Sequence, residues 1–196
     1  MFLRKESRMN RKIFTAGIFV CLSVLTGCIG SSSETRFFTL GGNGNEQSLP
    51  CRVTVLRFRN LSGADRRFLY RSQHNRMQSD EFNRWLLDPE LLLERLLRGK
   101  LSGTGNDEVR VRCVITDFEI DTVRNAAVLA GDFTLHCGEH LLTCHIKEEC
   151  KFSAESGDSA AAAAEAMDQC ASALAGKLRK KILELYKQSQ TKNVRL

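Results

Sequence analysis

The sequence predicts an α+β fold in which two helices cover one face of a mostly antiparallel sheet. Three observations favour it: runs of alternating apolar and polar residues, two segments with apolar residues three or four positions apart, and their order, β-β-β-α-β-β-β-α. With 196 residues, the chain has room for one domain with one modest core. We expect this domain to span residues 36–188, followed by a flexible tail at 189–196.

The first group of strands is short. Residues 36–40 (RFFTL) are prone to β structure, and a loop rich in Gly, Asn and Ser follows as far as Pro50. Residues 51–59 (CRVTVLRFR) alternate between apolar and polar positions, as a half-buried strand does. A further strand begins at Phe68, and residues 76–83 form a polar connection after it.

The pair Asp88-Pro89 predicts the start of the first helix, with Asp as the N-cap and Pro at the first helical position. Leucines four residues apart then indicate a helix that is buried on more than one side. We expect this helix to run to about Arg98 and to stop at Gly99.

The second half of the chain contains three longer strands and the longest helix. The strands are predicted at residues 108–120, 126–137 and 141–153, and the last two form a hairpin. The helix is predicted at residues 158–188. Its apolar stripe consists of Ala163, Met167, Cys170, Leu174, Leu178, Ile182 and Leu185. Its basic residues indicate a solvated face rather than a phosphate site; they are Lys177, Arg179, Lys180, Lys181 and Lys187.

The net charge of +6 does not indicate a nucleic-acid partner. Residues 1–27 carry five basic residues and one acidic residue, so the rest of the chain has a net charge of only +2. A chain so evenly balanced has no long-range attraction for a polyanion. We therefore expect no nucleic acid among its partners.

The N-terminus has the features of a secretory signal. A basic stretch at residues 1–12 precedes an apolar stretch at 13–25, whose 13 residues would span about 20 Å as a helix, less than the ~30 Å of a bilayer core. The segment then ends in Leu25-Thr26-Gly27-Cys28, which resembles the lipobox of bacterial lipoproteins. Such a signal at residues 1–27 would be removed, and lipid chains on Cys28 would hold the protein on a membrane.

Residues 28–35 are predicted to form a flexible tether after the lipidated cysteine. Under the common sorting rule, Asp after that cysteine retains a lipoprotein in the inner membrane. Ile29 occupies this position and favours the outer membrane, with the domain facing the periplasm.

Six cysteines remain once Cys21 is removed with the signal and Cys28 is lipidated. They are Cys51, Cys113, Cys137, Cys144, Cys150 and Cys170. In an oxidising compartment they could form up to three disulfides, with 15 possible connectivities, or remain free buried thiols. A zinc site with His136, His140 and His145 is the alternative, but the stretch offers only one pair with suitable spacing, Cys137-x-x-His140. We expect neither a metal nor a cofactor.

Several motifs recur in one order along the chain. They are Arg36-Phe37-Phe38-Thr39-Leu40, Tyr70-Arg71, Asn75-Arg76, Glu81-Phe82-Asn83-Arg84-Trp85 followed by a leucine-rich helix, Val114-Ile115-Thr116-Asp117-Phe118-Glu119, and an Ala-rich last helix. With the lipobox, this series resembles the ABC-type transport auxiliary lipoprotein family, the group containing paraquat-inducible protein C, over residues 28–186. The chain differs from that pattern in lacking a proline after its first long strand, in the spacing from Trp85 to Pro89, and in its cysteines.

The resemblance implies a role without catalysis. Members of the family are periplasm-facing lipoproteins that accompany MCE-type ABC transporters in lipid transport between the inner and outer membranes. The expected partners are the membrane, the MCE-type periplasmic tunnel protein and its ABC transporter, and further copies of this chain. Arg71, Arg84 and Trp85 are candidate contacts with a partner. The alternatives are a structural ion pair for each arginine and a place in the core for Trp85.

Two other functions compete with this one. An outer-membrane assembly or secretion-type lipoprotein is one, because residues 53–62 (VTVLRFRNLS) also look like the opening strand and turn of such domains. An enzyme such as a hydrolase is the other, but the sequence contains no Gly-x-Ser-x-Gly, HExxH or P-loop motif. We expect the protein not to be an enzyme.

Overall fold

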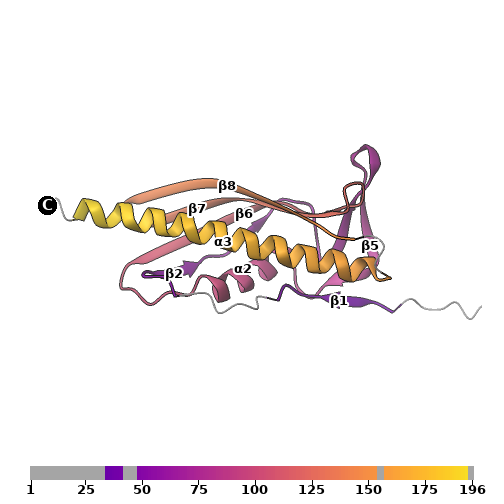
Figure 1. Cartoon of the computed structure of the whole chain (residues 1–196), viewed down its shortest axis with the longest axis horizontal. Coiled ribbons are helices and arrows are strands. Elements are labelled where there is room, and N and C mark those ends of the chain that lie inside the picture. The colour runs from indigo at the N-terminus through magenta and orange to yellow at the C-terminus, as the bar shows by residue number, and fades with distance from the viewer. Residues whose placement is uncertain (1–33, 42–47, 154–156, 194–196) are drawn as a thin grey trace, which may run out of the picture. The chain divides into compact units, whose positions relative to one another are not determined.

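The computed structural model describes residues 34–41, 48–153 and 157–193 (Figure 1). The predicted signal peptide, Cys28 and the tether as far as residue 33 lie outside the described residues. The elements, in chain order, are β1 (Arg36–Phe38), β2 (Arg52–Val55), β3 (Arg59–Asn60), β4 (Arg67–Arg71), a 3₁₀ turn (Gln73–Asn75), β5 (Met77–Trp85), α2 (Pro89–Lys100), β6 (Glu108–Asp121), β7 (Ala126–Cys137), β8 (His140–Lys151) and α3 (Ser159–Asn193).

Within the described part of the chain, eight strands form one mixed sheet. Six of them lie in the order β1-β5-β4-β6-β7-β8, while β2 and β3 pair with β6 outside this path. The long strands β6, β7 and β8 pair antiparallel. The pairs β1–β5, β2–β6, β3–β6 and β4–β6 are parallel. Strand β4 also pairs antiparallel with β5, and most of the paired residues belong to antiparallel pairs, so the predicted α+β fold with a mostly antiparallel sheet is confirmed.

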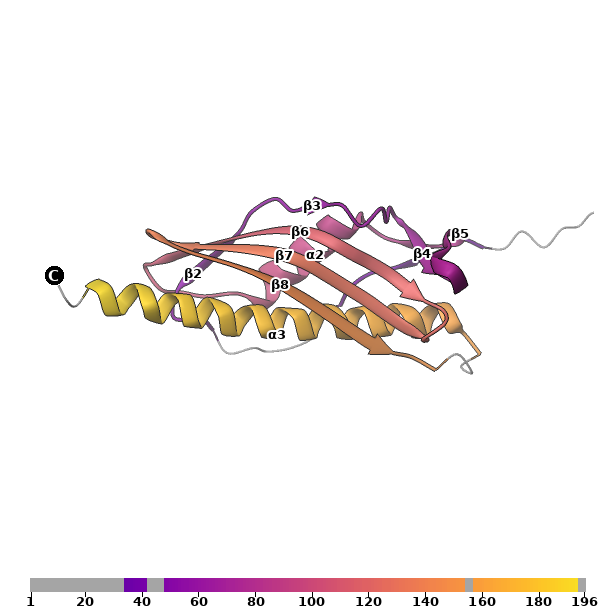
Figure 2. The ribbon, with the colours of Figure 1, turned by 90° about the horizontal axis from the view of Figure 1, so that it is seen from above.

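Both helices lie on the same side of the curved sheet (Figures 1 and 2). Helix α3 packs along β7 and β8, and α2 packs against β2, β3 and α3. The inward positions of β6 are those that the alternation predicts: Val109, Val111, Cys113 and Ile115 are almost fully buried. The entire predicted stripe of α3, from Ala163 to Leu185, is buried in the same core.

Helix α3 begins where the sequence predicts but extends further. The prediction that it ends at residue 188 is wrong, because Ser189 and Gln190 are helical and contact the sheet end. The Cys137 thiol donates to Ser189 Oγ at 3.4 Å, and Gln190 donates to the Asp107 carboxylate at 2.6 Å. Residues 189–193 are therefore helical rather than a flexible tail, and 194–196 lie outside the described residues.

Helix α2 also continues past its predicted end. Asp88 is the N-cap and Pro89 is at the first turn, as expected, although the Asp88 side chain accepts no capping hydrogen bond. The predicted stop at Gly99 is wrong: the helix runs to Lys100, and Leu101, which caps it, is 1% exposed. Burial of Leu101 outweighs the cost of about 1 kcal/mol for a glycine inside a helix.

Strand β5 is the main element missing from the prediction. Residues 76–83 were expected to be a polar connection, but Met77–Trp85 is a strand paired with β4 and β1. Most of its side chains before Trp85 are exposed, so no buried face imposes an apolar alternation on the sequence. The predicted strand at 51–59 is also divided in two, into β2 and β3.

Candidate functional site: the β1–β5 surface

Arg71, one of the candidate partner contacts, lies at the end of β4 and forms an ion pair with Glu119 of β6. Its guanidinium donates two hydrogen bonds, at 2.6 and 2.8 Å, to the two oxygens of that carboxylate. The Glu119 side chain is only 6% exposed, so Arg71 neutralises a buried charge. The same pairing raises the pKa of the Arg71 guanidinium. This geometry matches the structural alternative for Arg71.

Trp85, the last residue of β5, is part of the core. Its ring stacks on Phe68 with a centroid distance of 4.4 Å and meets Phe118 edge-on at 5.3 Å. The side chain is 1% exposed, so its surface is already covered by the chain itself. This burial matches the alternative of a place in the core for Trp85, where its ring fixes β5.

Arg84 points to the opposite side of β5 from Trp85. In the parallel pairing of β1 with β5, it lies directly opposite Phe37. Phe82 and Leu86, which are two residues before and after Arg84, are exposed as well, and Leu86 follows the end of β5. We call Phe37, Phe82, Arg84 and Leu86 the β1–β5 patch.

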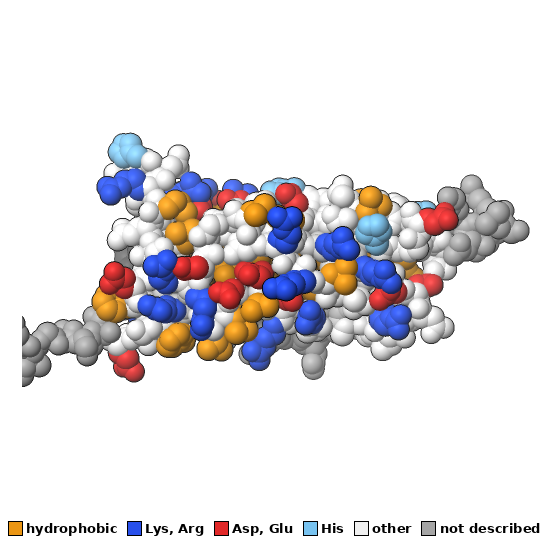
Figure 3. Space-filling view, turned by 180° about the vertical axis from the view of Figure 1, so that it is seen from behind, with side chains coloured by type: hydrophobic (Ala, Val, Ile, Leu, Met, Phe, Trp, Pro, Cys, Tyr) orange, Lys and Arg blue, Asp and Glu red, His pale blue; other side chains and the backbone are white. Residues whose placement is uncertain are grey.

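The β1–β5 patch combines exposed apolar groups with a positive charge. Phe37 is 56% exposed, and Phe82 and Leu86 are each 44% exposed. Arg84 is also exposed, and its guanidinium donates to the Glu81 carbonyl at 3.3 Å. Figure 3 shows hydrophobic side chains gathered, among basic ones, at the end of the molecule where β1 lies. Exposed aromatic and arginine side chains of this kind are typical of protein-binding surfaces.

Contacts of β1 with the core, with β5 and with Asp158 hold the β1–β5 patch in place. On the inner side of β1, Phe38 packs on Phe68 with a centroid distance of 5.1 Å. Arg36 donates to the Asn83 side chain at 3.0 Å and forms an ion pair with Asp158. Backbone hydrogen bonds also continue past the strands, since Leu86 N–H donates to the Phe38 carbonyl at 2.7 Å. These contacts hold the outer side chains without covering them.

Strand β1 ends the sheet on one side and is only three residues long. The strand next to it is β5, so the other edge of β1 pairs with no described strand. A free edge adjoining exposed aromatic side chains can accept a strand from another protein. The β1–β5 patch and this edge therefore form one continuous candidate binding surface.

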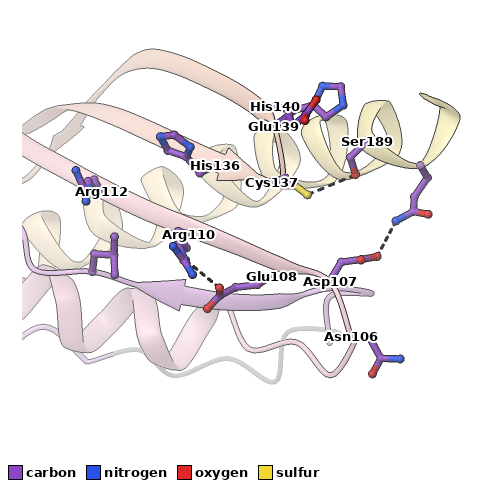
Figure 4. A pocket seen from close by; sticks show the side chains of 13 residues that line it. Asn106, Asp107, Glu108, Arg110, Arg112, His136, Cys137, Glu139, His140 and Ser189 are labelled. Atoms are coloured by element: carbon purple, nitrogen blue, oxygen red, sulfur yellow. Dashed lines mark hydrogen bonds and ion pairs between the residues drawn. The ribbon is translucent and has the colours of Figure 1, made fainter. Parts of the chain in front are cut away.

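A second feature is a groove of about 1130 Å³ at the far end of the molecule (Figure 4). It lies between the start of β6, the β7–β8 turn and the end of α3, and its walls include Glu108, Arg110, Arg112, His136 and His140. Arg110 donates to Glu108 at 2.9 Å. Glu108 and Arg110 in this wall thus pair with each other.

The cysteine and histidine side chains near the groove do not form a reactive pair. The Cys137 thiol donates a hydrogen bond to the Ser189 hydroxyl. Burial raises the pKa of the nearby Cys51 thiol, and this disfavours its thiolate form. His145 lies further along β8, 2.8 Å from Asp132. Within the described residues, no group of three or more His, Cys, Asp or Glu side chains is arranged to hold a metal ion.

All six cysteines of the domain are free thiols in the structure. Cys51, Cys113, Cys137 and Cys170 are buried, while Cys144 and Cys150 are half-buried on β8. The basic face of α3 is solvated and ion-paired: Lys177 lies 2.7 Å from Glu148, and Lys181 lies 2.9 Å from Glu184. In the part of the chain that the structure describes, no helix has the length and apolar character needed to cross a membrane.

The sequence singled out only part of this site. It identified Arg84, but Phe37 was read as part of a strand and Leu86 was not singled out. The sequence does contain a pattern that indicates this surface, because the exposed residues Phe82, Arg84 and Leu86 are spaced two apart around the buried Trp85. This pattern indicates an exposed surface only when β5 is a strand and β1 is its parallel neighbour.

Comparison with known proteins extends the description of the fold. No protein-family model matches the sequence, and no curated protein is detectably similar to it. One solved structure, of an uncharacterized protein, is 14% identical and superposes with a TM-score of 0.61, covering 76% of this chain and 99% of the other. A protein from Xanthomonas campestris, of the family DUF330, is 16% identical with a TM-score of 0.58, covering 80% of this chain and 99% of its own.

A lipoprotein candidate from Caulobacter crescentus aligns more loosely. It is 15% identical with a TM-score of 0.35, and the match covers 53% of this chain and 84% of the other, which is too little to support an argument. At these identities, the first two similarities show a common fold and nothing about function. The chain thus has the fold of a structure from the DUF330 family.

Proposed function

We propose that the protein is a lipid-anchored, periplasm-facing bacterial lipoprotein that serves as a non-catalytic auxiliary component of an MCE-type ABC transporter. In this role it would assist lipid transport between the inner and outer membranes, with its anchor in the outer membrane. The proposal combines the lipobox at Cys28, the ordered motifs of the auxiliary lipoprotein family and the β1–β5 patch.

The position of the patch supports the proposal most directly. Seven residues lie between Cys28 and Arg36, and the eight steps from one to the other reach at most about 29 Å in an extended chain. A membrane anchor at Cys28 would therefore keep the β1–β5 patch within roughly 30 Å of the bilayer surface. A protein that must bring a transporter component to a membrane needs its binding surface within that distance.

The chemistry of the described residues also fits an adaptor. The exposed apolar side chains of the β1–β5 patch suit protein contact, whereas in the groove at the far end Arg110 pairs with Glu108 and Gln190 donates to Asp107. Recognition by the β1–β5 patch would use Phe37 and Phe82 as apolar anchors and Arg84 for an acidic or carbonyl group. We assign the partner-binding role to this surface.

The test is co-purification from bacterial membranes with detergent. We expect the intact lipoprotein to bring down MCE-domain and ATPase subunits, and we expect Cys28→Ala to lose membrane attachment and most of that recovery. Phe37→Ser should lower recovery at least tenfold without lowering membrane attachment. Leu141→Ser is the matched control, because Leu141 is 58% exposed but lies at the other end of the molecule.

Three results would contradict parts of the proposal. Absence of every transporter subunit from the intact protein's eluate would remove the transport role. Recovery of an outer-membrane assembly or secretion complex instead would support the alternative lipoprotein class. Equal loss of partners in Phe37→Ser and Leu141→Ser would show that the β1–β5 patch is not the binding surface.

A further inference from the structure

We propose that Cys150 and Cys170 form a disulfide bond that joins β8 to α3. The sequence left 15 connectivities open for the six cysteines, and the geometry selects one pair. The inference rests on the proposed function only for the oxidising compartment, since the proximity of the two sulfurs is independent of it.

Both cysteines lie beside the same residue of β7, Ala127. Cys150 is directly opposite Ala127 in the antiparallel pairing of β7 with β8. The Cys170 thiol, on the buried stripe of α3, donates to the Ala127 carbonyl at 3.3 Å. Besides burial, Cys150 is among the groups that raise the pKa of the Cys170 thiol, as a close neighbour does. Cys150 and Cys170 are therefore neighbours across Ala127.

The other cysteines are separated by intervening strands. Cys113 on β6 and Cys144 on β8 are both opposite Phe133, which lies between them on β7. Two strand spacings amount to about 9.5 Å, beyond the roughly 7 Å limit for the Cα atoms of a disulfide. Phe133 is 1% exposed and fills that space, so Cys113 and Cys144 cannot meet.

Cys51 and Cys137 are separated in the same way. Cys137 is opposite Val109 of β6, and Val53 is opposite Val109 from the other side. Cys51 lies two residues before Val53, so β6 stands between the two cysteines. These four cysteines are therefore expected to remain thiols when Cys150 and Cys170 pair.

The reaction is a thiol–disulfide exchange with an external disulfide donor, such as a periplasmic dithiol oxidase or oxidised glutathione. The Cys150 thiolate attacks the donor disulfide, forms a mixed disulfide and releases one donor thiolate. The Cys170 thiolate then attacks the Cys150 sulfur and expels the second. Cys150 and Cys170 lose two protons and two electrons in total, and the donor disulfide is reduced to two thiols.

Exposure sets the order of these steps. Cys150 is half-buried and can be approached by a donor, whereas Cys170 is fully buried. Burial raises the pKa of the Cys170 thiol, which makes it the slower, second nucleophile. The mixed disulfide with the donor would therefore form at Cys150 first, and Cys170 would then attack it to complete the bond.

The test is peptide mapping of the full-length lipoprotein extracted from its membrane with detergent. Free thiols are alkylated while the protein is unfolded in denaturant, so that the buried ones also react, and the protein is then digested with trypsin without reduction. We expect the peptides 148–151 and 152–177 to appear joined, at their summed mass less two hydrogens, with the other four cysteines alkylated. Cys150→Ser should abolish the joined species, and Cys113→Ser should leave it unchanged.

A second measurement uses the reduced full-length protein incubated with oxidised glutathione under native conditions. Formation of the joined peptides here, but not in protein from cells, would support the pairing and contradict the exported compartment. Alkylated Cys150 and Cys170 after this incubation would overturn the pairing. Reduction of the disulfide should lower Tm by about 5–10 °C in the wild type and leave Tm unchanged in Cys150→Ser.

Discussion

Arg36 at the start of β1 forms an ion pair with Asp158, which immediately precedes α3, across 122 positions of sequence. Asp158 also accepts a hydrogen bond from the Ala161 backbone N–H at 3.0 Å, so it serves as the N-terminal cap of α3. One carboxylate thus links the edge strand of the candidate binding surface to the longest helix. The positive end of the helix dipole favours its negative charge.

This link should make stability depend on acidity. The Ala161 backbone hydrogen bond and Arg36 lower the pKa of Asp158 below its ordinary 3.8. The carboxylate therefore stabilises the folded state above that value, and the contribution disappears as the pH falls through the lower, folded pKa. We expect Asp158→Asn to be less stable than the wild type at pH 7 and equally stable near pH 2. Urea unfolding followed by Trp85 fluorescence measures both; a pH-independent difference would refute the prediction.

Truncation to alanine should lower the free energy of unfolding at Arg71 but hardly change it at Arg84. Arg71→Ala would leave Glu119 buried without its partner, and we expect a loss of about 3 kcal/mol in the free energy of unfolding. Arg84→Ala removes an exposed side chain, and we expect a change within about 0.5 kcal/mol. Urea denaturation of the two variants makes the comparison. Similar losses in both would mean that the Arg71–Glu119 pair is not the stabilising contact assigned here.

Two glycines provide a matched pair of backbone tests. A Cβ on Gly103 would lie 1.9 Å from the Cys51 carbonyl oxygen, so the α2–β6 connection has to move. We expect Gly103→Ala to cost about 1–3 kcal/mol, the usual range for overpacking. Gly99 is inside α2 with nothing within 4 Å of a Cβ, and Gly99→Ala should stabilise by about 0.5–1 kcal/mol. Thermal unfolding distinguishes the two signs.

Phe118 and Phe82 test the division between core and surface. Phe118 is 1% exposed and meets Trp85 edge-on, so Phe118→Ala should lower the free energy of unfolding by about 3–5 kcal/mol. Phe82, 44% exposed on the β1–β5 patch, should cost less than about 0.5 kcal/mol when replaced by Ala. Chemical denaturation compares them, and a large loss in Phe82→Ala would mean that the patch is part of the core.

The sequence predicted the elements whose burial is periodic. Val109, Val111 and Ile115 alternate along β6, and the stripe of α3 recurs at helical spacing; both follow from packing one face against a core. The end of α3 was missed because Ser189 and Gln190 are polar. Their contacts with Cys137 and Asp107 depend on a sheet end that is distant in sequence.

The candidate surface was less predictable. Arg84 stood out as an arginine beside aromatic residues, but its neighbour Phe37 is 47 positions away. Their contact depends on the parallel register of β1 with β5, and a three-residue strand carries too little pattern to reveal its partner. Local sequence likewise could not separate Trp85 from Arg84. The Trp85 side chain is buried and the Arg84 side chain is exposed because neighbouring residues of β5 point to opposite faces of the sheet, and the face of Trp85 packs on Phe68.

The length of α3 has a mechanical consequence. Its 35 residues extend about 52 Å, and it runs from the end where β1 begins to the end where β7 turns into β8 (Figure 1). The helix therefore acts as a rigid spacer that holds the end carrying β1 and the end carrying the β7–β8 turn about 50 Å apart.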